Sequence, residues 1–231
     1  MELNSHTERH KIWAIILAAG ESKRMGKPKL LLPFGETTII ETVVGNAMQS
    51  KVDEVLVVLG CNAENIAKKI EGTPAKTSVN PDFRDGMLSS IQWGFKSLPE
   101  DTRAAIIMLG DQPLIPGSVI DRVIDAYRQT EKSIVLPVYN KRRGHPILID
   151  MKHREEVKRL SPDVGLRVLV HNHTEDILEV AVDAPGILKD IDTAEDYSRE
   201  IRLSIRGKYD FVRTNSEDFA KRKRQEIDME E

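Results

Sequence analysis

The sequence predicts an α/β fold in which helices cover both faces of a mostly parallel β-sheet. Its apolar runs are short and continuous, as in strands that are buried on both faces, rather than alternating between apolar and polar residues. Segments with helical spacing of apolar residues separate these runs. Ligands bind such sheets beyond the carboxyl ends of the strands, so residues that directly follow a strand are the candidates for a site.

The first half of the chain contains four of the predicted strands. Ile12 to Leu17 is an Ile-rich apolar run that leads into Ala-Ala-Gly. Thr38 and Glu41 have the spacing of a capping box, which predicts a helix from there to about Met48. The other elements expected in this half are strands at 54–59, 77–80 and 104–109 and helices at 62–70 and 85–97.

The second half continues the alternation and then changes character. We expect helices at 116–127, 152–159, 165–170 and 194–201, and strands at 133–138, 146–149 and 177–182. A basic turn at 140–144 separates two of these strands. From about Ser204 onwards Lys, Arg, Asp and Glu dominate, so we expect one domain of residues 1–203 followed by a charged C-terminal appendage of residues 204–231.

Composition excludes several classes of protein. The net charge of −3 argues against a dedicated nucleic-acid binder, whose surface is usually basic. A single cysteine, Cys61, cannot form an internal disulfide, which suits a reducing compartment. No apolar run approaches the roughly 18 residues of a membrane span, and the polar N-terminus lacks the apolar core of a signal peptide. We therefore expect a cytoplasmic protein with neither nucleic acid nor membrane as a partner.

A basic, glycine-bearing loop follows the first predicted strand. It has four cations within seven residues and two glycines that allow close backbone approach: Lys23, Arg24, Lys27, Lys29, Gly20 and Gly26. Such a loop can neutralise a polyphosphate. It is not a Walker A loop, because five residues separate the glycines and Pro28 follows Lys27. Basic residues alone would equally suit a solvated loop, but the position after a buried strand favours phosphate binding.

Further candidates have alternative structural interpretations. Asp111 follows the strand at 104–109 and could hold a hard cation such as magnesium, although Asp also suits a turn or a helix cap. Asp192 with Glu195 matches a helix-capping pair, a role that can coexist with metal binding. His145 could bind substrate or move protons, although a lone histidine is more often structural.

The loop sequence Leu-Ala-Ala-Gly-x-Ser-x-Arg-Met-Gly-x-x-Lys at 17–29 resembles the signature of nucleotidyltransferases with a Rossmann-like, glycosyltransferase-A-like fold. Within that group the chain is similar to the MobA-like branch, and most to the molybdenum cofactor cytidylyltransferases. The resemblance implies a three-layer fold and a triphosphate held by the loop, with these nucleotide-binding residues: Leu17, Ala18, Ala19, Gly20 and Lys29. It also implies that Arg24 and Lys29 bind phosphate and stabilise charge at the reacting phosphorus.

Five further stretches match the family in order, over about residues 12–201. The resemblance implies that Asp111, also expected to be catalytic, and Asp192 bind Mg²⁺. It implies that residues 80–90 hold the base and ribose through Asn80, Gly86, Ser89 and Ser90. Without the resemblance, such a stretch would indicate a strand-to-helix turn. The acceptor-binding residues implied are His145, Asp163 and Arg167. Pro162 replaces a family glycine, which leaves the shape of that loop open.

The resemblance implies transfer of CMP from CTP to the phosphate of molybdopterin, with release of pyrophosphate. A molybdoenzyme or its maturation chaperone is a further partner that it allows. Three alternatives stay open: a GTP-dependent guanylyltransferase, transfer to a sugar or polyol phosphate, and a non-catalytic cofactor carrier. By resemblance, the Ala18-Ala19 pair and Gly144-His145-Pro146 favour CTP over GTP. The physics of these residues does not by itself determine which base is bound.

Overall fold

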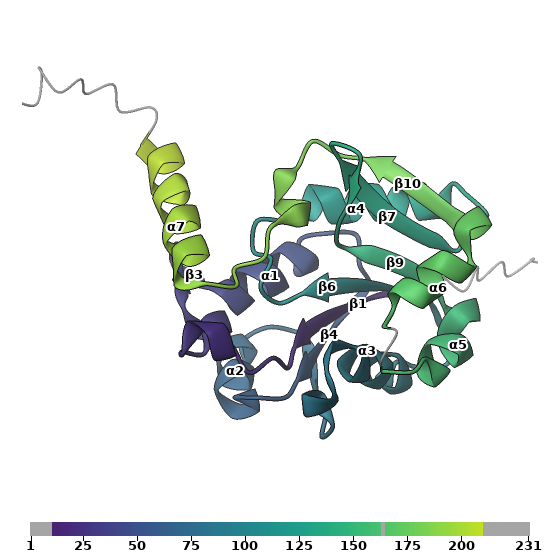
Figure 1. Ribbon diagram of the computed structural model, residues 1–231, viewed down its shortest axis with the longest axis horizontal. Coiled ribbons are helices and arrows are strands. Elements are labelled where there is room, and N and C mark those ends of the chain that lie inside the picture. Colours follow the sequence, from purple (N-terminus) through teal and green to yellow (C-terminus); the bar gives the residue numbers. More distant parts are fainter. Residues whose placement is uncertain (1–10, 163–164, 210–231) are drawn as a thin grey trace, which may run out of the picture. The chain divides into compact units, whose positions relative to one another are not determined.

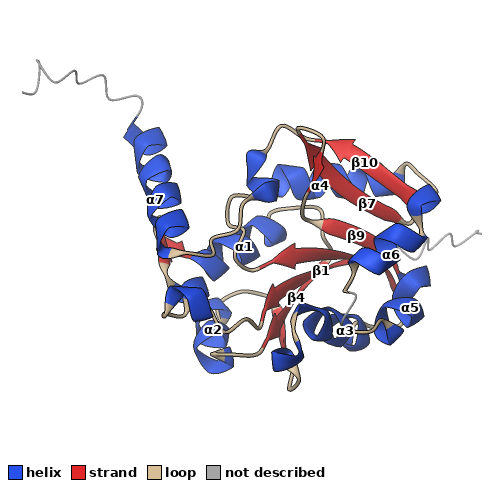
Figure 2. Cartoon of the chain, in the orientation of Figure 1, coloured by secondary structure: helices blue, strands red, loops and turns tan. Residues whose placement is uncertain are grey.

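The computed structural model describes residues 11–162 and 165–209, with the backbone alone for 202–209. The chain divides into two units, residues 1–194 and 195–231. The first unit is a three-layer α/β structure in which helices cover both faces of one large sheet (Figure 1, Figure 2). This arrangement confirms the predicted fold class.

The large sheet is mixed but mostly parallel. Seven of its eight strands have the order β10-β7-β9-β6-β1-β4-β5, and the eighth, the short β8, pairs with β7. All pairs are parallel except those of β9 with β6 and β7 and that of β8 with β7. The strands are β1 (Lys11–Ala18), β4 (Glu54–Leu59), β5 (Lys76–Val79), β6 (Thr102–Leu109), β7 (Ile134–Tyr139), β8 (Arg142–Arg143), β9 (Ile147–Asp150) and β10 (Ile177–Ala181).

Six helices accompany this sheet in the described part of the first unit. They are α1 (Ile39–Met48), α2 (Ala63–Ile70), α3 (Met87–Ser97), α4 (Gly117–Arg128), α5 (Arg154–Arg159) and α6 (Arg167–Asn172). A separate small hairpin joins β2 (Pro33–Phe34) to β3 (Thr37–Thr38). Single 3₁₀ turns lie at η1 (Lys23–Met25), η2 (Lys29–Leu31), η3 (Phe83–Asp85), η4 (Met151–His153), η5 (Thr174–Asp176) and η6 (Pro185–Leu188).

Strand alternation builds a hydrophobic core on each face of the sheet. Trp13 and Ile15 of β1 face a cluster that includes Phe95 of α3, Val157 of α5 and Leu169 of α6. Successive strand residues point to opposite faces, so the fully buried Ala14 and Ile16 face the other side. That side is covered by α1 and α4, which contact each other and the strands beneath them. Burial on both faces explains why the strand sequences are continuously apolar.

The start of α1 confirms the predicted capping box. The hydroxyl of Thr38 accepts a hydrogen bond from the amide of Glu41 at 3.4 Å, and a Glu41 carboxylate oxygen accepts from the amide of Thr38 at 2.8 Å. The two bonds satisfy N–H groups that the first turn of a helix leaves free. The capping box therefore fixes where α1 begins, directly after the hairpin that follows the basic loop.

The order of the strands creates a switch point at the carboxyl end of β1. From β1 the chain adds β4 and β5 on one side and then crosses to place β6 on the other side. The loops that leave the neighbouring parallel strands β1 and β6 therefore begin side by side at this end of the sheet, where such folds bind ligands. The basic loop follows β1, and Asp111 follows β6, so the sheet brings these two predicted features to one edge.

The described part of the second unit is helical. Helix α7 spans Ala194–Tyr209, and an ion pair of 2.6 Å between Arg199 and Asp196 lies within it. The predicted boundary after residue 203 falls inside this helix, and the division of the chain at that point stays a prediction. The appendage beyond residue 209 lies outside the described residues. No helix among the described residues has the length and apolar character needed to cross a bilayer.

Candidate active site

The basic loop folds back on itself before it reaches Lys29. Ser22 and Gly26 adopt left-handed backbone conformations, with φ of 53° and 62°. The Ser22 carbonyl accepts a hydrogen bond from the amide of Met25 at 3.0 Å, and its hydroxyl accepts from the amide of Lys29 at 3.1 Å. Glycine suits the second position because it adopts positive φ without steric cost. These bonds return the chain toward the end of β1 and hold the start of η2.

Lys29, Asp111, Asp192 and Arg24 form one charged cluster. The Lys29 ammonium lies 2.5 Å from Oδ2 of Asp111 and 2.9 Å from Oδ1 of Asp192. The Arg24 guanidinium lies 3.0 Å from Oδ2 of Asp192. The Lys29 and Asp111 side chains are only 13% and 19% exposed, whereas that of Arg24 is 71% exposed. The structure therefore brings together four predicted residues from three separate segments, with Lys29 at their centre.

Backbone contacts fix the two carboxylates in place. Gly110, at the end of β6, donates its N–H to the Leu17 carbonyl of β1 at 3.0 Å, which sets the position of Asp111 beside the basic loop. The buried Ile191 donates its N–H to the Asp111 carbonyl at 3.1 Å. Since Asp192 is the next residue, this bond anchors the second carboxylate against the first.

Negative charge is in excess at this buried position. Burial raises the pKa of the Asp111 carboxyl; Lys29 opposes this rise, and the carboxylates of Asp190 and Asp192 add to it. Burial would lower the pKa of Lys29, but the carboxylates of Asp111 and Asp192 outweigh burial and raise it. The carboxylates contribute to both shifts, because Asp111 and Asp192 contact the same ammonium group, whereas burial raises the pKa only at Asp111. Such a site favours an additional bound cation.

Asp111 and Asp192 are the side chains that could hold that cation. Oδ1 of Asp111 is buried and has no hydrogen-bond partner among the described residues. An unpaired buried carboxylate oxygen is costly, and a metal ion is one of its natural partners. Carboxylate oxygens are the ligands that hard divalent cations prefer. The residues present therefore fit the predicted metal site.

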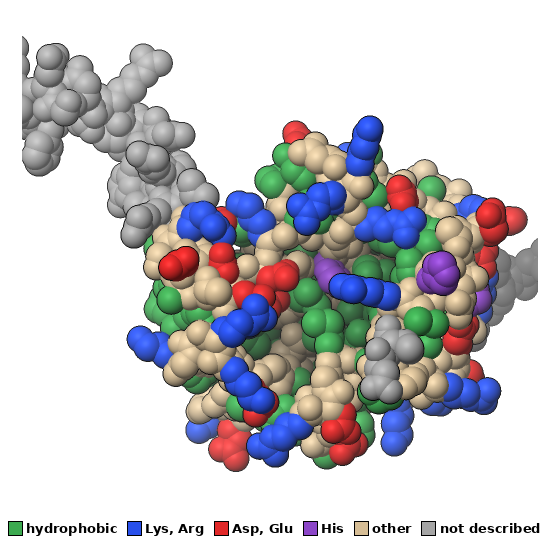
Figure 3. All heavy atoms as spheres, viewed as in Figure 1, with side chains coloured by type: hydrophobic (Ala, Val, Ile, Leu, Met, Phe, Trp, Pro, Cys, Tyr) green, Lys and Arg blue, Asp and Glu red, His purple; other side chains and the backbone are tan. Residues whose placement is uncertain are grey.

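A cavity of about 560 Å³ opens beside this cluster. The predicted residues that line it are Leu17, Ala19, Gly20, Arg24, Lys29, Gly86, Ser90, Asp111 and Asp192. Figure 3 shows acidic and basic side chains gathered next to a hollow whose walls are largely hydrophobic. Ala18 is fully buried, so its predicted nucleotide contact stays a prediction.

Asn80 stabilises the predicted base-binding stretch through buried hydrogen bonds. Its side chain is buried, and its amide donates to the hydroxyls of Ser89 at 3.0 Å and Ser90 at 3.1 Å. Its side-chain oxygen accepts from the amide of Asp82 at 3.0 Å. These bonds tie the end of β5 to the start of α3 and shape the turn at Gly86. Direct nucleotide contacts by Asn80 and Ser89 stay predictions.

A second cavity, of about 970 Å³, adjoins the first and shares part of its lining with it. The shared residues are Leu17, Met87, Leu109 and Asp190. The predicted acceptor residues His145 and Arg167 line the second cavity, together with Arg142 and Arg143 of β8. Burial lowers the pKa of His145, an effect that Asp190 opposes. The third predicted acceptor residue, Asp163, lies outside the described residues.

Close backbone packing sets the position of His145. Its N–H donates to the Ile187 carbonyl at 3.2 Å. A Cβ at the preceding Gly144 would lie 2.3 Å from that same carbonyl oxygen, so a side chain there would clash. The Gly-His-Pro sequence thus has a packing role as well as its predicted acceptor role.

Asp190 and Gln112 were not among the predicted site residues. The Gln112 amide donates to Oδ1 of Asp190 at 2.5 Å, and Asp190 lines both cavities. The available signal was the Asp-x-Asp spacing of residues 190 and 192, because alternate residues of an extended segment point to the same side. Ile191 between them is buried as a core residue, in agreement with that pattern.

The fold and the site together define the class of this protein as a nucleotidyltransferase. A family model described as the MobA-like NTP transferase domain matches residues 14–187, so the chain belongs to the MobA-like NTP transferase family. The matched region contains the basic loop, Asp111 and His145, and it ends before Asp192.

Known relatives carry more than one activity in their names. The nicotine blue oxidoreductase of Paenarthrobacter nicotinovorans is 30% identical over 199 residues, which cover 81% of this chain and 95% of the relative. The molybdenum cofactor cytidylyltransferase of Escherichia coli (strain K12) is 26% identical over 186 residues, which cover 79% of this chain and 92% of the relative.

Solved structures share the fold. Rv0371c from Mycobacterium tuberculosis H37Rv matches with a TM-score of 0.75 and 31% identity, covering 83% of this chain and 97% of that chain. A manganese complex of Rv0371c matches with a TM-score of 0.71, 30% identity and coverage of 83% and 98%.

Proposed function

We propose that this protein transfers CMP from CTP to the phosphate of a molybdopterin-type cofactor and releases pyrophosphate, with Mg²⁺ as the metal. The observation that carries the proposal is the convergence of Lys29, Asp111 and Asp192 beside two adjoining cavities. The similarity to the cytidylyltransferase of Escherichia coli supports this choice of base and acceptor.

Each cavity suits one substrate. The triphosphate of CTP would lie in the first cavity, against the loop backbone at Gly20 and the cations of Arg24 and Lys29. The base and ribose would extend toward Gly86 and Ser90. The acceptor would lie in the second cavity, where apolar walls suit a flat heterocycle and arginines suit its phosphate.

The reaction is a displacement at the α-phosphorus. An oxygen of the acceptor phosphate attacks, a new P–O bond forms, and the bond to the bridging oxygen breaks, so that pyrophosphate leaves with the electron pair. The acceptor phosphate is already largely ionised at neutral pH, so the protein need not supply a general base. Lys29 and Arg24 would stabilise negative charge on the α-phosphate and the leaving group. The loop and the cavity walls would align the two substrates.

Asp111 and Asp192 would hold the metal ion, which polarises phosphoryl oxygens when it is bound. The free Oδ1 of Asp111 supports this role, and the manganese complex of Rv0371c supports a divalent ion in a related protein. The Lys29 ammonium lies between the two carboxylates. On nucleotide binding it would exchange a carboxylate contact for one with a phosphate oxygen.

The test is pyrophosphate release from CTP, GTP, ATP and UTP, each with MgCl₂ and molybdopterin as acceptor. We expect turnover with CTP and a larger rise in Tm with CTP than with the other nucleotides. Preference for GTP would overturn the base assignment, and turnover with only a sugar or polyol phosphate would overturn the acceptor. Binding of the cofactor without pyrophosphate release from any nucleotide would indicate a carrier.

The relative named nicotine blue oxidoreductase favours a second candidate, a redox activity. The cluster of two carboxylates with one ammonium favours phosphoryl chemistry instead, because hydride transfer has no need of a cation site. Incubation with reduced nicotinamide cofactor and a quinonoid dye separates the two. Oxidation of that cofactor without pyrophosphate release under the conditions above would favour the oxidoreductase.

A further inference from the structure

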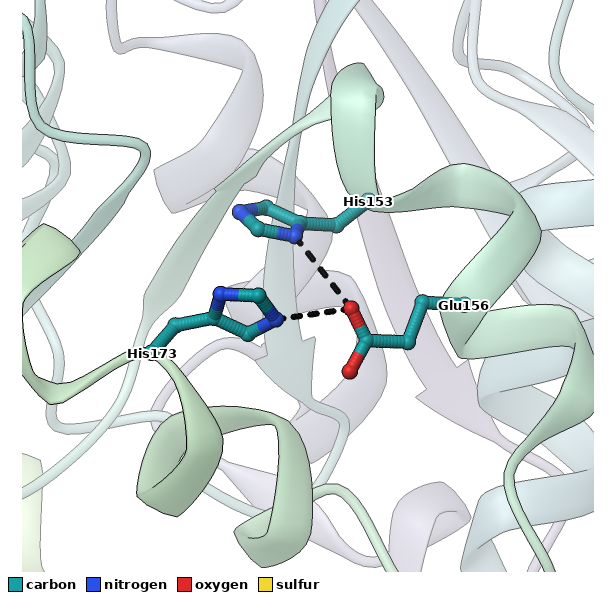
Figure 4. A group of neighbouring side chains, drawn as sticks. All are labelled: His153, Glu156 and His173. Carbon is teal, nitrogen blue, oxygen red and sulfur yellow. Dashed lines mark hydrogen bonds and ion pairs between the residues drawn. The ribbon is translucent and has the colours of Figure 1, made fainter.

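Three side chains that commonly bind metals converge outside the set of residues that line the two cavities. They are His153 at the end of η4, Glu156 in the first turn of α5, and His173 directly after α6. One potential ligand atom from each residue lies within 4.8 Å of the other two. Figure 4 shows both imidazole rings beside the Glu156 carboxylate, to which dashed lines connect them.

The separations are those of a group that could close around an ion. Oε2 of Glu156 lies 2.7 Å from Nε2 of His173 and 3.7 Å from Nδ1 of His153. The second separation is too long for a hydrogen bond. Ligand atoms that surround a tetrahedral zinc ion at its usual bond lengths are about 3.4 Å apart. The two observed separations bracket that value, so side-chain adjustments could bring the ligand atoms around one ion.

A hydrogen bond outside the cluster orients His153. Its Nε2 lies 2.7 Å from the hydroxyl of Ser133, and both side chains are buried. The bond leaves Nδ1 of the ring facing Glu156, as the 3.7 Å separation shows. Histidines that bind metals typically use their other ring nitrogen in such a contact, which fixes the orientation and the tautomer of the ring.

We propose that His153, Glu156 and His173 form a second metal site, specific for a divalent transition metal of the zinc class. Two imidazole nitrogens and one carboxylate are ligands that zinc favours, whereas magnesium prefers oxygen ligands alone. The Glu156 and His173 side chains are 36% and 28% exposed, so solvent can supply the fourth ligand. The two imidazole ligands distinguish this site from the all-carboxylate site at Asp111 and Asp192.

The position of the site gives it a structural consequence. Its ligands lie on both sides of the segment 157–172, which carries Pro162, Arg167 and other residues that line the second cavity. A metal ion bound by all three side chains would join the two ends of this segment. Closing a loop in this way limits its conformational freedom. The ion would therefore stabilise one wall of the second cavity without contacting a nucleotide.

The test is zinc binding to the full-length chain, measured with a chromophoric competitor. The titration uses the Asp111→Asn, Asp192→Asn double variant, so that the carboxylates of the first site do not contribute. We expect this protein to retain one zinc ion per chain and to gain Tm with ZnCl₂ but not with MgCl₂. Adding Glu156→Gln or His173→Gln should weaken zinc binding by more than the ~10-fold typical of a lost outer contact.

Two further variants sharpen the result. Ser133→Ala keeps all three ligands and should weaken zinc binding by about 10-fold, through the orientation of His153. It tests the site even where a ligand variant fails to fold. His171→Gln removes an exposed imidazole of α6 outside the cluster and should leave binding unchanged. No stoichiometric zinc in the double variant, or equal binding with and without Glu156→Gln and His173→Gln, would overturn the proposal.

Discussion

The Lys29 ammonium lies 2.5 Å from a carboxylate oxygen of Asp111, although 82 positions separate the two residues in the chain. The contact links the loop after β1 to the turn after β6. Asp192 contacts the same ammonium from a third segment, 163 positions from Lys29. Replacing Lys29 or Asp111 should therefore change both turnover and Tm in ways that can be measured separately.

Replacing Lys29 by alanine should lower the rate of pyrophosphate release by about 100- to 1,000-fold, because one stabilising cation at the reacting phosphate is lost. It should also lower Tm at neutral pH, because the half-buried carboxylates of Asp111 and Asp192 lose their shared partner. Steady-state turnover and thermal unfolding measure the two effects. Lys68→Ala removes an exposed cation of α2, outside the loop, and serves as the control. Equal turnover by both variants would remove Lys29 from the site.

Replacing Asp111 by asparagine should abolish turnover without lowering the Tm of the metal-free protein. The folded-state pKa of Asp111 is raised, mainly by burial. The native state therefore binds this proton more tightly than the unfolded state does, and ionisation at neutral pH costs stability. A neutral asparagine of similar shape removes that cost. Thermal unfolding with and without MgCl₂ measures this, and only the wild type should gain Tm with the ion. A clear drop in the metal-free Tm would contradict the electrostatic interpretation.

Replacing Thr38 by alanine should lower the free energy of unfolding by about 1 kcal/mol, because α1 loses its cap. The hydrogen bond from Thr38 is the main reason why the pKa of Glu41 lies below its ordinary value. A lowered pKa in the folded state stabilises above the unfolded-state pKa, and this stability is lost as pH falls through the folded-state value. The difference between wild type and variant should therefore shrink in acid. Urea unfolding at neutral and acidic pH tests this. If the difference in the free energy of unfolding between wild type and variant does not depend on pH, Glu41 does not contribute to it.

Replacing Tyr127 by phenylalanine should destabilise the fold by about 1–3 kcal/mol and leave turnover unchanged. The Tyr127 hydroxyl donates to Oδ2 of the buried Asp150 at 2.5 Å and joins α4 to the end of β9. Burial and this carboxylate raise the pKa of Tyr127, so the hydroxyl stays protonated and able to donate. Chemical denaturation gives the loss, with Tyr139→Phe in the half-buried end of β7 as control. An equal loss in both variants would show that the effect is not specific to this bond.

Local sequence determined most of the elements. The strand predicted at 54–59 is β4, and the capping box of Thr38 and Glu41 begins α1 as expected. These features depend on residues near one another in the chain, such as a continuous apolar run or a side chain that caps its own helix. The resemblance of residues 17–29 to a known signature then predicts a phosphate-binding loop after the first strand.

The sequence alone did not determine the pairing of β9, which lies antiparallel between β6 and β7 in an otherwise mostly parallel sheet. Its apolar residues satisfy a buried strand in either direction, so direction depends on the path of the whole chain. Likewise the sequence alone did not show that the buried Asn80 amide donates to two serines of the adjoining turn, and its contact with nucleotide stays a prediction.

The sequence by itself thus determined most of the strands and helices, and which polar residues follow the strands. Only the tertiary structure decided that Lys29 lies between Asp111 and Asp192, that Asp190 lines both cavities, and that His153, Glu156 and His173 meet. The physical reason is that local patterns depend on neighbouring residues. Contacts across many positions depend instead on strand order and packing, which are properties of the whole folded chain.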